Sequence, residues 1–325
     1  MKNQRWRGIA ILAVMLAFAT AAFAAEEGTF DRALKVTGPV EMEVATGSGQ
    51  IMVHSGAAGA VTIKGTVRVS DSWMGTSDAK AKLQRILGNP PVEQSGNVIK
   101  IGRVDDPELR RNVSISYEIV TPAETRLVAK TGSGDQTVAG LRGPVEIATG
   151  SGRLRANDIG SEVRASSGSG DIGLENINGA VRASTGSGRV SALRVAGSFD
   201  ASSGSGEIES EQTAGGNARV STGSGSIRLR GVKGALTVST GSGDIQAQGE
   251  PTSEWKVDTG SGSVELHVPQ QAAFDVYARS SSGRITVDHP MTVRGTINRH
   301  EVRGSVRGGG ALLNVHTASG NIEVR

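Results

Sequence analysis

The sequence contains no cysteine, so neither a disulfide framework nor a cysteine-ligated metal centre can hold the fold together. Aromatic residues make up only 3% of the 325 residues, whereas glycine occurs 46 times. A chain with so few large side chains cannot fill a thick, close-packed globular core. The composition therefore favours a thin and regular structure.

Residues 1–24 do not share this composition. They begin with basic residues, continue with an apolar run and end in Ala22-Phe23-Ala24, which matches an A-x-A cleavage site. This order is typical of a secretory signal peptide, and the run is short for a bilayer span of about 20 residues. We therefore expect an exported protein, in the periplasm or at the cell surface, with no membrane span after signal removal.

An excess of charge of one sign is absent from the rest of the chain. The formal net charge is +3, but three of the 35 basic residues, Lys2, Arg5 and Arg7, belong to the signal segment. Removing them leaves 35 − 3 = 32 basic residues against 32 acidic residues. The apparent pI of 9.3 is therefore no argument for a nucleic acid or an anionic membrane as partner.

A short motif, Thr or Ser followed by Gly-Ser-Gly, recurs along the chain at a nearly fixed spacing. Its last glycine is used here as the marker of each repeat. The first marker is Gly49, and degenerate copies follow at Gly283 and Gly320. The regular markers, separated by steps of 18 or 19 residues, are Gly134, Gly152, Gly170, Gly188, Gly206, Gly225, Gly243 and Gly262. Fixed-period self-similarity of this kind indicates a solenoid.

Apolar and polar residues alternate on both sides of each marker. Apolar residues stand seven and five positions before the marker and two positions after it, as at Val181, Ala183 and Val190 around Gly188. A period of two predicts strands with one buried face. Each repeat is thus predicted to be two short strands joined by a turn, in which the glycines supply backbone angles that other residues resist.

Stacking such repeats places each strand parallel to its copy in the next rung, so that equivalent residues form columns about 4.8 Å apart. The Thr and Ser residues of the motif then form a column of hydroxyls able to hydrogen-bond along the axis. The hexapeptide helix, which also has an 18-residue rung, is excluded because the sixth and twelfth residues after Val163 are Ser169 and Glu175. The prediction is an all-β, single-stranded parallel β-helix, or β-solenoid, of roughly 13 rungs with 18 residues each.

The two ends depart from the period. Gly49 and Gly134 are 85 residues apart, and the intervening segment near 77–88 carries Leu83, Ile86 and Leu87 at helical spacing. We expect one short helix there, within an N-terminal β region over 25–130 that caps the solenoid. The solenoid itself is expected over 131–325, with less regular C-terminal rungs.

The repeated TGSG units, the lead-in YEIVTPAETRLVAKTGSGD and the closing GSVRGGGALLNVHTASGNIEV resemble the bacterial DUF4097 proteins, which carry the label "putative adhesin". The resemblance covers roughly residues 30–325. It implies a right-handed parallel β-helix associated with the cell envelope, with no established enzymatic activity. Some relatives are associated with envelope stress. Gln136 departs from the family pattern, because it places a polar side chain in a column predicted to be buried.

The strongest polar pattern lies immediately after the markers, where acidic and basic residues alternate from rung to rung. A polar stripe that binds a charged polymer is one interpretation, but a structural charge ladder is favoured because like charges stacked on neighbouring strands repel. The members of this ladder are Asp135, Arg153, Asp171, Arg189 and Glu207.

No constellation of catalytic or metal-binding residues is expected. Glu209 is predicted to lie one rung from Arg228, and Glu265 one rung from Gln246, so neither site brings two carboxylates together. Calcium sites are disfavoured because Asp alternates with Arg in the GSGD motifs, and the five histidines share no zinc-ligand spacing. Trp255 is expected to pack in the core, and Trp73 to make a contact within the cap.

The sequence therefore predicts a non-enzymatic exported protein, without cofactor or metal, that acts in adhesin-like binding or scaffolding through a rigid surface. Its expected partner is an envelope protein or a surface polysaccharide. Two alternatives stay open. One is a β-helix that binds or cleaves polysaccharide, and the other is a self-assembling envelope filament or a stress-sensing component.

Overall fold

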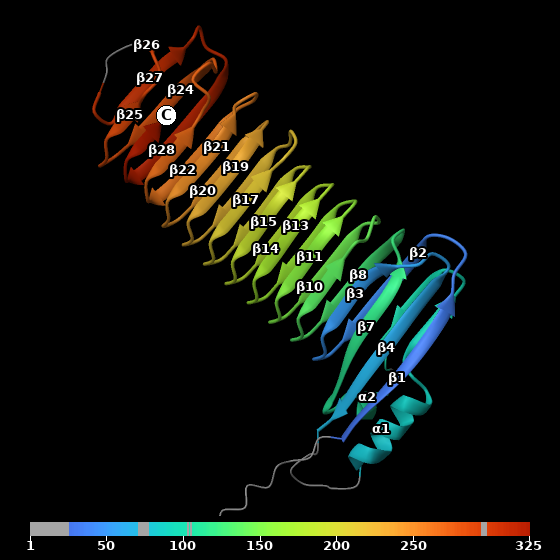
Figure 1. The fold of residues 1–325 in the computed structure, drawn as a ribbon. Coiled ribbons are helices and arrows are strands. Elements are labelled where there is room, and N and C mark those ends of the chain that lie inside the picture. The colour runs from blue at the N-terminus through green and yellow to red at the C-terminus, as the bar shows by residue number, and fades with distance from the viewer. Residues whose placement is uncertain (1–25, 71–77, 103, 105, 294–297) are drawn as a thin grey trace, which may run out of the picture.

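The computed structural model describes residues 26–70, 78–102, 104, 106–293 and 298–325. Two long β-sheets run side by side and give the molecule the form of a rod (Figure 1). The expected signal segment and Trp73 lie outside the described residues. Among the described residues, no helix has the length and apolar character needed to cross a membrane.

The middle of the rod is a stack of two-stranded rungs, with one strand in each sheet and every strand parallel to its copies in the neighbouring rungs. The strands that follow the markers lie in the 14-stranded sheet, called sheet A, and those that precede them in the 15-stranded sheet B. The regular strands of sheet A are β9 (Gln136–Ala139), β11 (Leu154–Ile159), β13 (Ile172–Ile177), β15 (Val190–Val195), β17 (Ile208–Gln212), β19 (Ile227–Lys233), β21 (Ile245–Glu250) and β23 (Val264–His267). Those of sheet B are β8 (Thr125–Thr131), β10 (Val145–Thr149), β12 (Val163–Ser167), β14 (Val181–Thr185), β16 (Phe199–Ser203), β18 (Ala218–Thr222), β20 (Leu236–Thr240) and β22 (Trp255–Ser261). The predicted β-solenoid is confirmed.

The core lies between the two sheets and is built from the predicted apolar columns. Each column is in register from rung to rung, as in the pairing of Val163 with Val181 and of Ile172 with Val190. The column residues before and after the markers are buried throughout the regular rungs. Trp255 is fully buried in its column and donates a hydrogen bond from Nε1 to the Gly234 carbonyl at 3.0 Å, so its predicted packing role is confirmed.

The N-terminal region both begins the solenoid and closes it. Strands β2 (Val40–Thr46) and β3 (Ile51–Gly56) stack in parallel on β8 and β9 and form the first rung. The chain between them and β8 leaves the stack and returns to it. This excursion, together with the strand that precedes β2, comprises β1 (Glu26–Lys35), β4 (Ala60–Val69), α1 (Asp78–Gly88), β5 (Val92–Ser95), β6 (Val98–Ile101), α2 (Pro107–Arg110) and β7 (Val113–Pro122).

Strands β6 and β7 continue the parallel stack beyond β2 and β3, whereas the remaining strands pair antiparallel. Strand β7 pairs in parallel with β3, whereas β4 and β1 continue sheet A in antiparallel fashion, and β5 pairs antiparallel with β6 at the end of sheet B. Helix α1 packs against β1 and β4 through the predicted apolar stripe, in which Leu83 and Ile86 are buried. The predicted helix is therefore confirmed, and the short helix α2 is an addition that the sequence pattern did not predict.

The C-terminal rungs are not stacked in sequence order. After β23 the chain forms β24 (Phe274–Ser280), β25 (Ile285–Val287), β26 (Met291–Val293) and β27 (Glu301–Val306), and then returns as β28 (Ala311–Ser319) and β29 (Ile322–Val324). Strand β28 lies between β22 and β24 (Figure 1). Strand β29 lies between β23 and β25. The antiparallel strands β27 and β26 close sheet B. The last rung in sequence is therefore next to last in space.

The parallel stack comes close to the roughly 13 rungs expected. Among the described residues, twelve strands of each sheet follow the parallel course, from β7 to β25 in sheet A and from β6 to β24 in sheet B. Strands β1, β4, β5, β26 and β27 carry strand-like sequence but pair antiparallel, so they cap the stack instead of lengthening it. Twelve rungs correspond to a rod of about 58 Å.

Candidate functional site: two repetitive faces of the solenoid

At the Gly-Ser-Gly edge, the backbones of neighbouring rungs leave no room for a side chain. A Cβ atom built on Gly170 would lie 1.8 Å from the carbonyl oxygen of Gly152, and one built on Gly168 would lie 2.3 Å from that of Gly150. The regular markers do not have positive φ angles. Glycine is therefore required because backbone stacks on backbone, and the turn conformation proposed from the sequence is not the reason.

The motif hydroxyls join the rungs, although they do not bond to one another. Thr185 Oγ1 donates to the Gly170 carbonyl of the preceding rung at 3.0 Å and accepts from the backbone N–H of Gly188 in its own rung at 3.1 Å. Ser203 repeats this pattern with Gly188 and Gly206. The hydroxyl column thus acts through the marker glycines, and it holds this edge in register.

The predicted charge ladder lies in register along this edge, but charge pairing is only part of its structure. Asp135 and Asp171 each accept a hydrogen bond from the backbone N–H of the next rung's arginine, Arg153 at 2.8 Å and Arg189 at 2.9 Å. The side chains of Arg189 and Glu207 form an ion pair at 2.7 Å. The acidic members therefore cap exposed main-chain donors, which is a structural role.

The opposite turn of the solenoid carries a polar column that sequence reasoning missed. Asp158, Asn176 and Arg194 have φ angles of 55°, 55° and 56°, in the left-handed region that Asn and Asp tolerate better than Arg. Asn176 Nδ2 donates to Asp158 Oδ1 at 2.8 Å, and Arg194 contacts both Asn176 and Glu175. The sequence holds one clue to this column. Asn157 and Asp158 stand five and six residues after the marker Gly152, and an Asn-Asp pair is a common turn composition.

A few polar side chains are buried inside the rod. Gln136 is 1% exposed in the apolar column, where its Nε2 donates to the Ala148 carbonyl and its Oε1 has no partner among the described residues. A single hydrogen bond therefore compensates for the burial of the Gln136 amide in the apolar column. His289 is also buried, against the ring of Phe274 at 5.2 Å between centroids. These groups lie inside the core and form no shared site.

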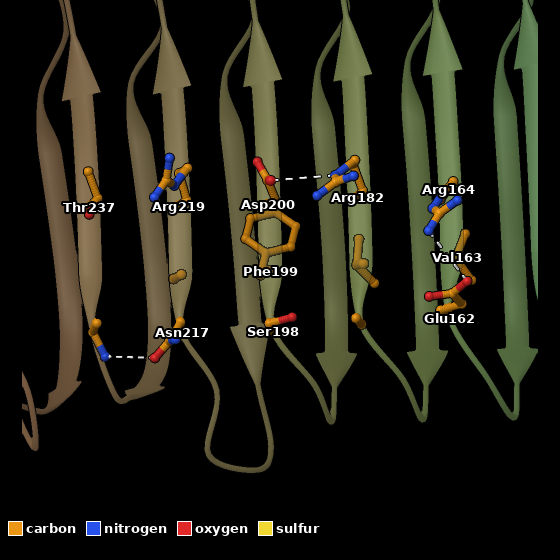
Figure 2. A pocket seen from close by; sticks show the side chains of 14 residues that line it. Glu162, Val163, Arg164, Arg182, Ser198, Phe199, Asp200, Asn217, Arg219 and Thr237 are labelled. Atoms are coloured by element: carbon orange, nitrogen blue, oxygen red, sulfur yellow. Dashed lines mark hydrogen bonds and ion pairs between the residues drawn. The ribbon is translucent and has the colours of Figure 1, made fainter.

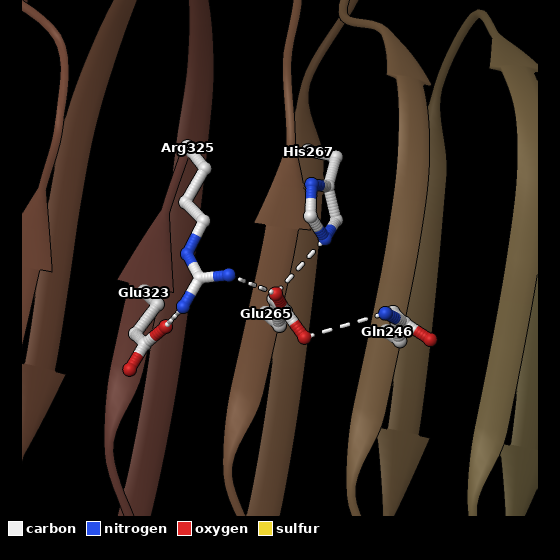
Figure 3. A network of polar contacts seen from close by, with 5 residues as sticks. All are labelled: Gln246, Glu265, His267, Glu323 and Arg325. Carbon is white, nitrogen blue, oxygen red and sulfur yellow. Dashed lines mark hydrogen bonds and ion pairs between the residues drawn. The ribbon is translucent and has the colours of Figure 1, made fainter.

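The outer face of sheet A carries a cluster of polar side chains near the C-terminal end (Figure 3). Glu265 Oε1 lies 3.0 Å from His267 Nε2 and 3.0 Å from an Arg325 guanidinium nitrogen, while Gln246 Nε2 donates to Glu265 Oε2 at 3.3 Å. Arg325 also contacts Glu323 at 2.5 Å. We call these five residues the Glu265 network.

The Glu265 network corrects an expectation about carboxylates. Glu265 was predicted to have Gln246 as its neighbour, and that pairing is present, but Glu323 occupies its other side because β29 is inserted beside β23. Two carboxylates therefore stand in adjacent rungs. Glu209 has Arg228 in register, as predicted, and forms an ion pair with Arg230 at 3.1 Å.

Two grooves adjoin the Glu265 network. One, of about 620 Å³, includes Lys233, Glu250 and Pro269 among its lining residues, and the other, of about 270 Å³, includes Arg228. His267, Arg230 and Gln248 line both grooves. Among the described residues, no group of three or more His, Asp or Glu side chains is arranged to hold a metal ion. The arrangement offers hydrogen-bonding and charged groups to a ligand.

The outer face of sheet B carries a further groove, of about 490 Å³, across β12, β14, β16, β18 and β20 (Figure 2). Arg164, Arg182 and Arg219 line it together with Glu162 and Asp200. Small residues also line it, namely Ala180, Ser198 and Ala235. These arginines stand at one position of the repeat, six residues before the marker.

Comparison with known proteins places the chain by its repeats. The family described as Toastrack DUF4097 matches residues 112–325. No curated protein matches the chain.

Three solved structures are similar at low identity. A "putative cell adhesion protein" from Clostridium sporogenes ATCC 15579 is 10% identical, with 93% of this chain and 99% of that chain covered and a TM-score of 0.18. A "putative lipid binding protein" from Parabacteroides distasonis ATCC 8503 is 11% identical, with 91% and 96% covered and a TM-score of 0.38. A "putative adhesin" from Bacteroides fragilis NCTC 9343 is 10% identical, with 92% and 97% covered and a TM-score of 0.25. Because the family match spans most of the chain and includes the regular rungs, the protein belongs to the Toastrack DUF4097 family.

Proposed function

We propose that this protein is an exported, non-catalytic component of the bacterial envelope, which binds its partner through the outer faces of the solenoid. The observation that supports the proposal is the register of the outward columns. Residues such as Ser166, Ser184 and Ser202 face outward at the same position of consecutive rungs, so a single side-chain chemistry repeats at intervals of about 4.8 Å. A surface of this kind suits a long or repetitive partner.

The rigidity of the faces supports binding over catalysis. Each rung is fixed to the next by parallel backbone pairing and, at the Gly-Ser-Gly edge, by the hydroxyl bonds of the motif. Such preorganisation reduces the ordering cost when an extended ligand binds. Several charged side chains that line the grooves are held in ion pairs, as Arg182 is with Asp200 and Arg325 is with Glu265.

The test uses the full chain produced in a bacterial host with its N-terminal segment. We expect cleavage after Ala24 on export, which N-terminal sequencing of the envelope fraction detects. The purified protein, fluorescently labelled, should bind isolated envelopes in a saturable way and be displaced by unlabelled protein. Binding no stronger than that of a globular protein of matched charge would contradict the proposal.

A polysaccharide-cleaving β-helix is the second candidate function, and the Glu265 network favours it. Glu265 and Glu323 stand in adjacent rungs beside a groove, and paired carboxylates on one face are the usual equipment for glycosidic bond hydrolysis. Here Arg325 forms ion pairs with both carboxylates. Incubation with a panel of linear polysaccharides distinguishes the candidates, since new reducing ends that disappear in Glu265→Gln would establish cleavage.

End-to-end assembly into a filament receives less support. Continuing the parallel stack would require matching strands at the ends of both sheets. Antiparallel strands occupy three of the four sheet ends, namely β1, β5 and β26, and only β25 ends in the parallel course. A concentration-dependent increase in length, seen by electron microscopy, is the result that would favour assembly over the binding role.

A further inference from the structure

The arginine column of sheet B breaks the alternation of charge that the Gly-Ser-Gly edge maintains. The column runs from Glu146 through Arg164, Arg182 and Asp200 to Arg219, so the alternation breaks where Arg164 and Arg182 stand directly in register on neighbouring strands. Like charges opposite each other on adjacent strands are destabilising. A column built only for stability would alternate here as well, so the stacked arginines need a different explanation.

Carboxylates of the protein satisfy this column only in part. Arg164 lies 3.6 Å from Glu162, and Arg182 lies 3.5 Å from Asp200, both longer than the charge-assisted hydrogen bonds of about 2.7–2.9 Å that arginine forms in good geometry. Arg219 is in register with Asp200 but forms no ion pair within the described part of the chain. Glu146, in register with Arg164, lies 3.9 Å from Lys130 instead. Among the described residues, the three guanidinium groups therefore have two ion-pair partners, Glu162 and Asp200, and both are held loosely.

The groove beside the column runs along the rod and crosses five strands (Figure 2). Its lining combines the guanidinium groups with small side chains such as Ala180, Ser198 and Ala235. A second outward column runs parallel to the arginines, two positions further along each strand. Its members are all exposed serines, Ser166, Ser184, Ser202, Ser221 and Ser239.

We propose, building on the binding function above, that this face holds a linear acidic polysaccharide whose chain runs along the solenoid axis. Its carboxylates bind the planar forks of Arg164, Arg182 and Arg219, which present paired donors to such groups. The serine hydroxyls serve the sugar hydroxyls beside them. The rung repeat of about 4.8 Å is of the same order as one sugar residue of an extended chain, so the periods of protein and ligand can coincide.

The chemistry of the face disfavours a folded protein as occupant. The hot spots of protein interfaces are enriched in Trp, Tyr and Arg, and of these three the groove is lined by Arg alone. The large hydrophobic side chains found exposed in the described chain are Met52, Val98, Val120 and Leu312, and all four lie outside this groove. A polymer that binds through charges and hydroxyls suits this groove better than a folded protein does.

The experiment measures binding of the full-length exported protein to polygalacturonate, a linear polyuronate, by calorimetry at low and at physiological salt. We expect saturable binding that weakens with salt and that is absent with fully methyl-esterified polygalacturonate. The double substitution Arg182→Gln/Arg219→Gln should lower the affinity at least tenfold. Arg153→Gln/Arg155→Gln, which removes the same charge from the other sheet, is the matched control and should bind as the wild type does.

Several outcomes would overturn the inference. These are no binding to polygalacturonate, equal binding to its esterified form, equal loss in the control pair, or much tighter binding to inorganic polyphosphate. Unchanged unfolding midpoints in both double variants verify that binding, and not folding, has been altered. If saturable binding to envelopes persists while polygalacturonate fails, the proposed function stands and the acidic polysaccharide is excluded; loss of both would refute the two together.

Discussion

The regular middle and the two ends of the rod obey the same stacking rule but differ in how sequence order relates to spatial order. In the middle, each rung lies on the one 18 or 19 residues before it. At the N-terminal end, Gly134 packs on Gly49 across 85 residues, and at the C-terminal end Gly320 packs on Gly262 while Gly283 packs on Gly320. Contact between matching columns therefore determines which rungs meet, whatever the length of chain that connects them.

This difference teaches where the stability of a thin solenoid resides. A middle rung has two identical neighbours, so its glycines, hydroxyls and apolar columns are satisfied on both sides. An end rung has one identical neighbour and one capping element. Substitutions at equivalent positions should consequently have different effects in the middle and at the ends, and the following expectations run from the largest effect to the smallest.

The largest difference is expected for the first glycine of the motif. In Gly132→Ala the new Cβ would meet the Gly47 carbonyl oxygen at 2.3 Å, a backbone atom that cannot turn away. We expect a loss of about 3 kcal/mol in unfolding free energy, as for overpacked sites. Gly47→Ala is the matched end-rung control, since a Cβ there meets no atom within 4 Å and should be nearly neutral. Urea unfolding monitored by circular dichroism measures both, and equal losses would refute the stacking explanation.

The next effect concerns a middle-rung hydroxyl. Thr185→Val keeps the shape of the side chain but leaves the Gly170 carbonyl and the Gly188 N–H without their shared partner. We expect a cost of about 2 kcal/mol. Thr185→Ser is the control, because Ser167 and Ser203 already make the same two bonds in neighbouring rungs. A valine variant as stable as the serine variant would show that the hydroxyl column adds nothing.

The N-terminal end should respond in the opposite direction at Tyr117. Its hydroxyl is buried with no partner among the described residues, so Tyr117→Phe should stabilise the protein by about 1 kcal/mol. Burial raises the pKa of the Tyr117 phenol, so the unfolded chain loses this proton first, and stability should fall as pH rises above about 10. Unfolding midpoints measured from pH 8 to 11 should decline more steeply for the wild type than for Tyr117→Phe. Parallel curves would contradict this account.

The smallest effect is expected at the exposed acidic caps. Asp171→Ala removes the acceptor for the Arg189 N–H and should cost about 0.5 kcal/mol. Asp171→Asn should be almost neutral because it keeps the oxygen, as Asn321 does for the N–H of Arg284. If the asparagine variant lost as much as the alanine variant, charge pairing, and not main-chain capping, would be the role of this column.

The sequence predicts the middle of the molecule well because strands one repeat apart pair with each other there, so the repeat period directly gives the register. The apolar columns, the two strands per rung and α1 follow from spacing alone, as Val163, Val181 and Leu83 illustrate. The reason why the motif needs glycine does not follow from spacing. It is the close approach between rungs, which Gly170 and Gly152 make only when the rungs are stacked.

The functional candidates were less accessible from sequence for the same reason. Glu265 and Glu323 are 58 residues apart and become neighbours only through the inserted final rung. The arginine column is visible in the sequence, because Arg164, Arg182 and Arg219 share one repeat position, but the alternation of charge after the markers is the more regular pattern. Repeat position is thus a sound guide to faces, and sequence order is a poor guide at the ends.

The central claim, that matching columns and not sequence order decide which rungs meet, can be measured directly with cysteine pairs, since the chain has no cysteine of its own. In sheet B, His316 is in register with Asp258 on one side and with Arg279 on the other. Adjacent rungs fall within the Cα separation of about 4.4–6.8 Å that a disulfide requires, whereas two rungs are about 9.6 Å apart. Under mild oxidation, we predict that Asp258→Cys/His316→Cys and His316→Cys/Arg279→Cys form disulfides and that Asp258→Cys/Arg279→Cys does not. Efficient crosslinking of the Asp258 and Arg279 positions, with none between those of Asp258 and His316, would show sequential stacking and contradict the account.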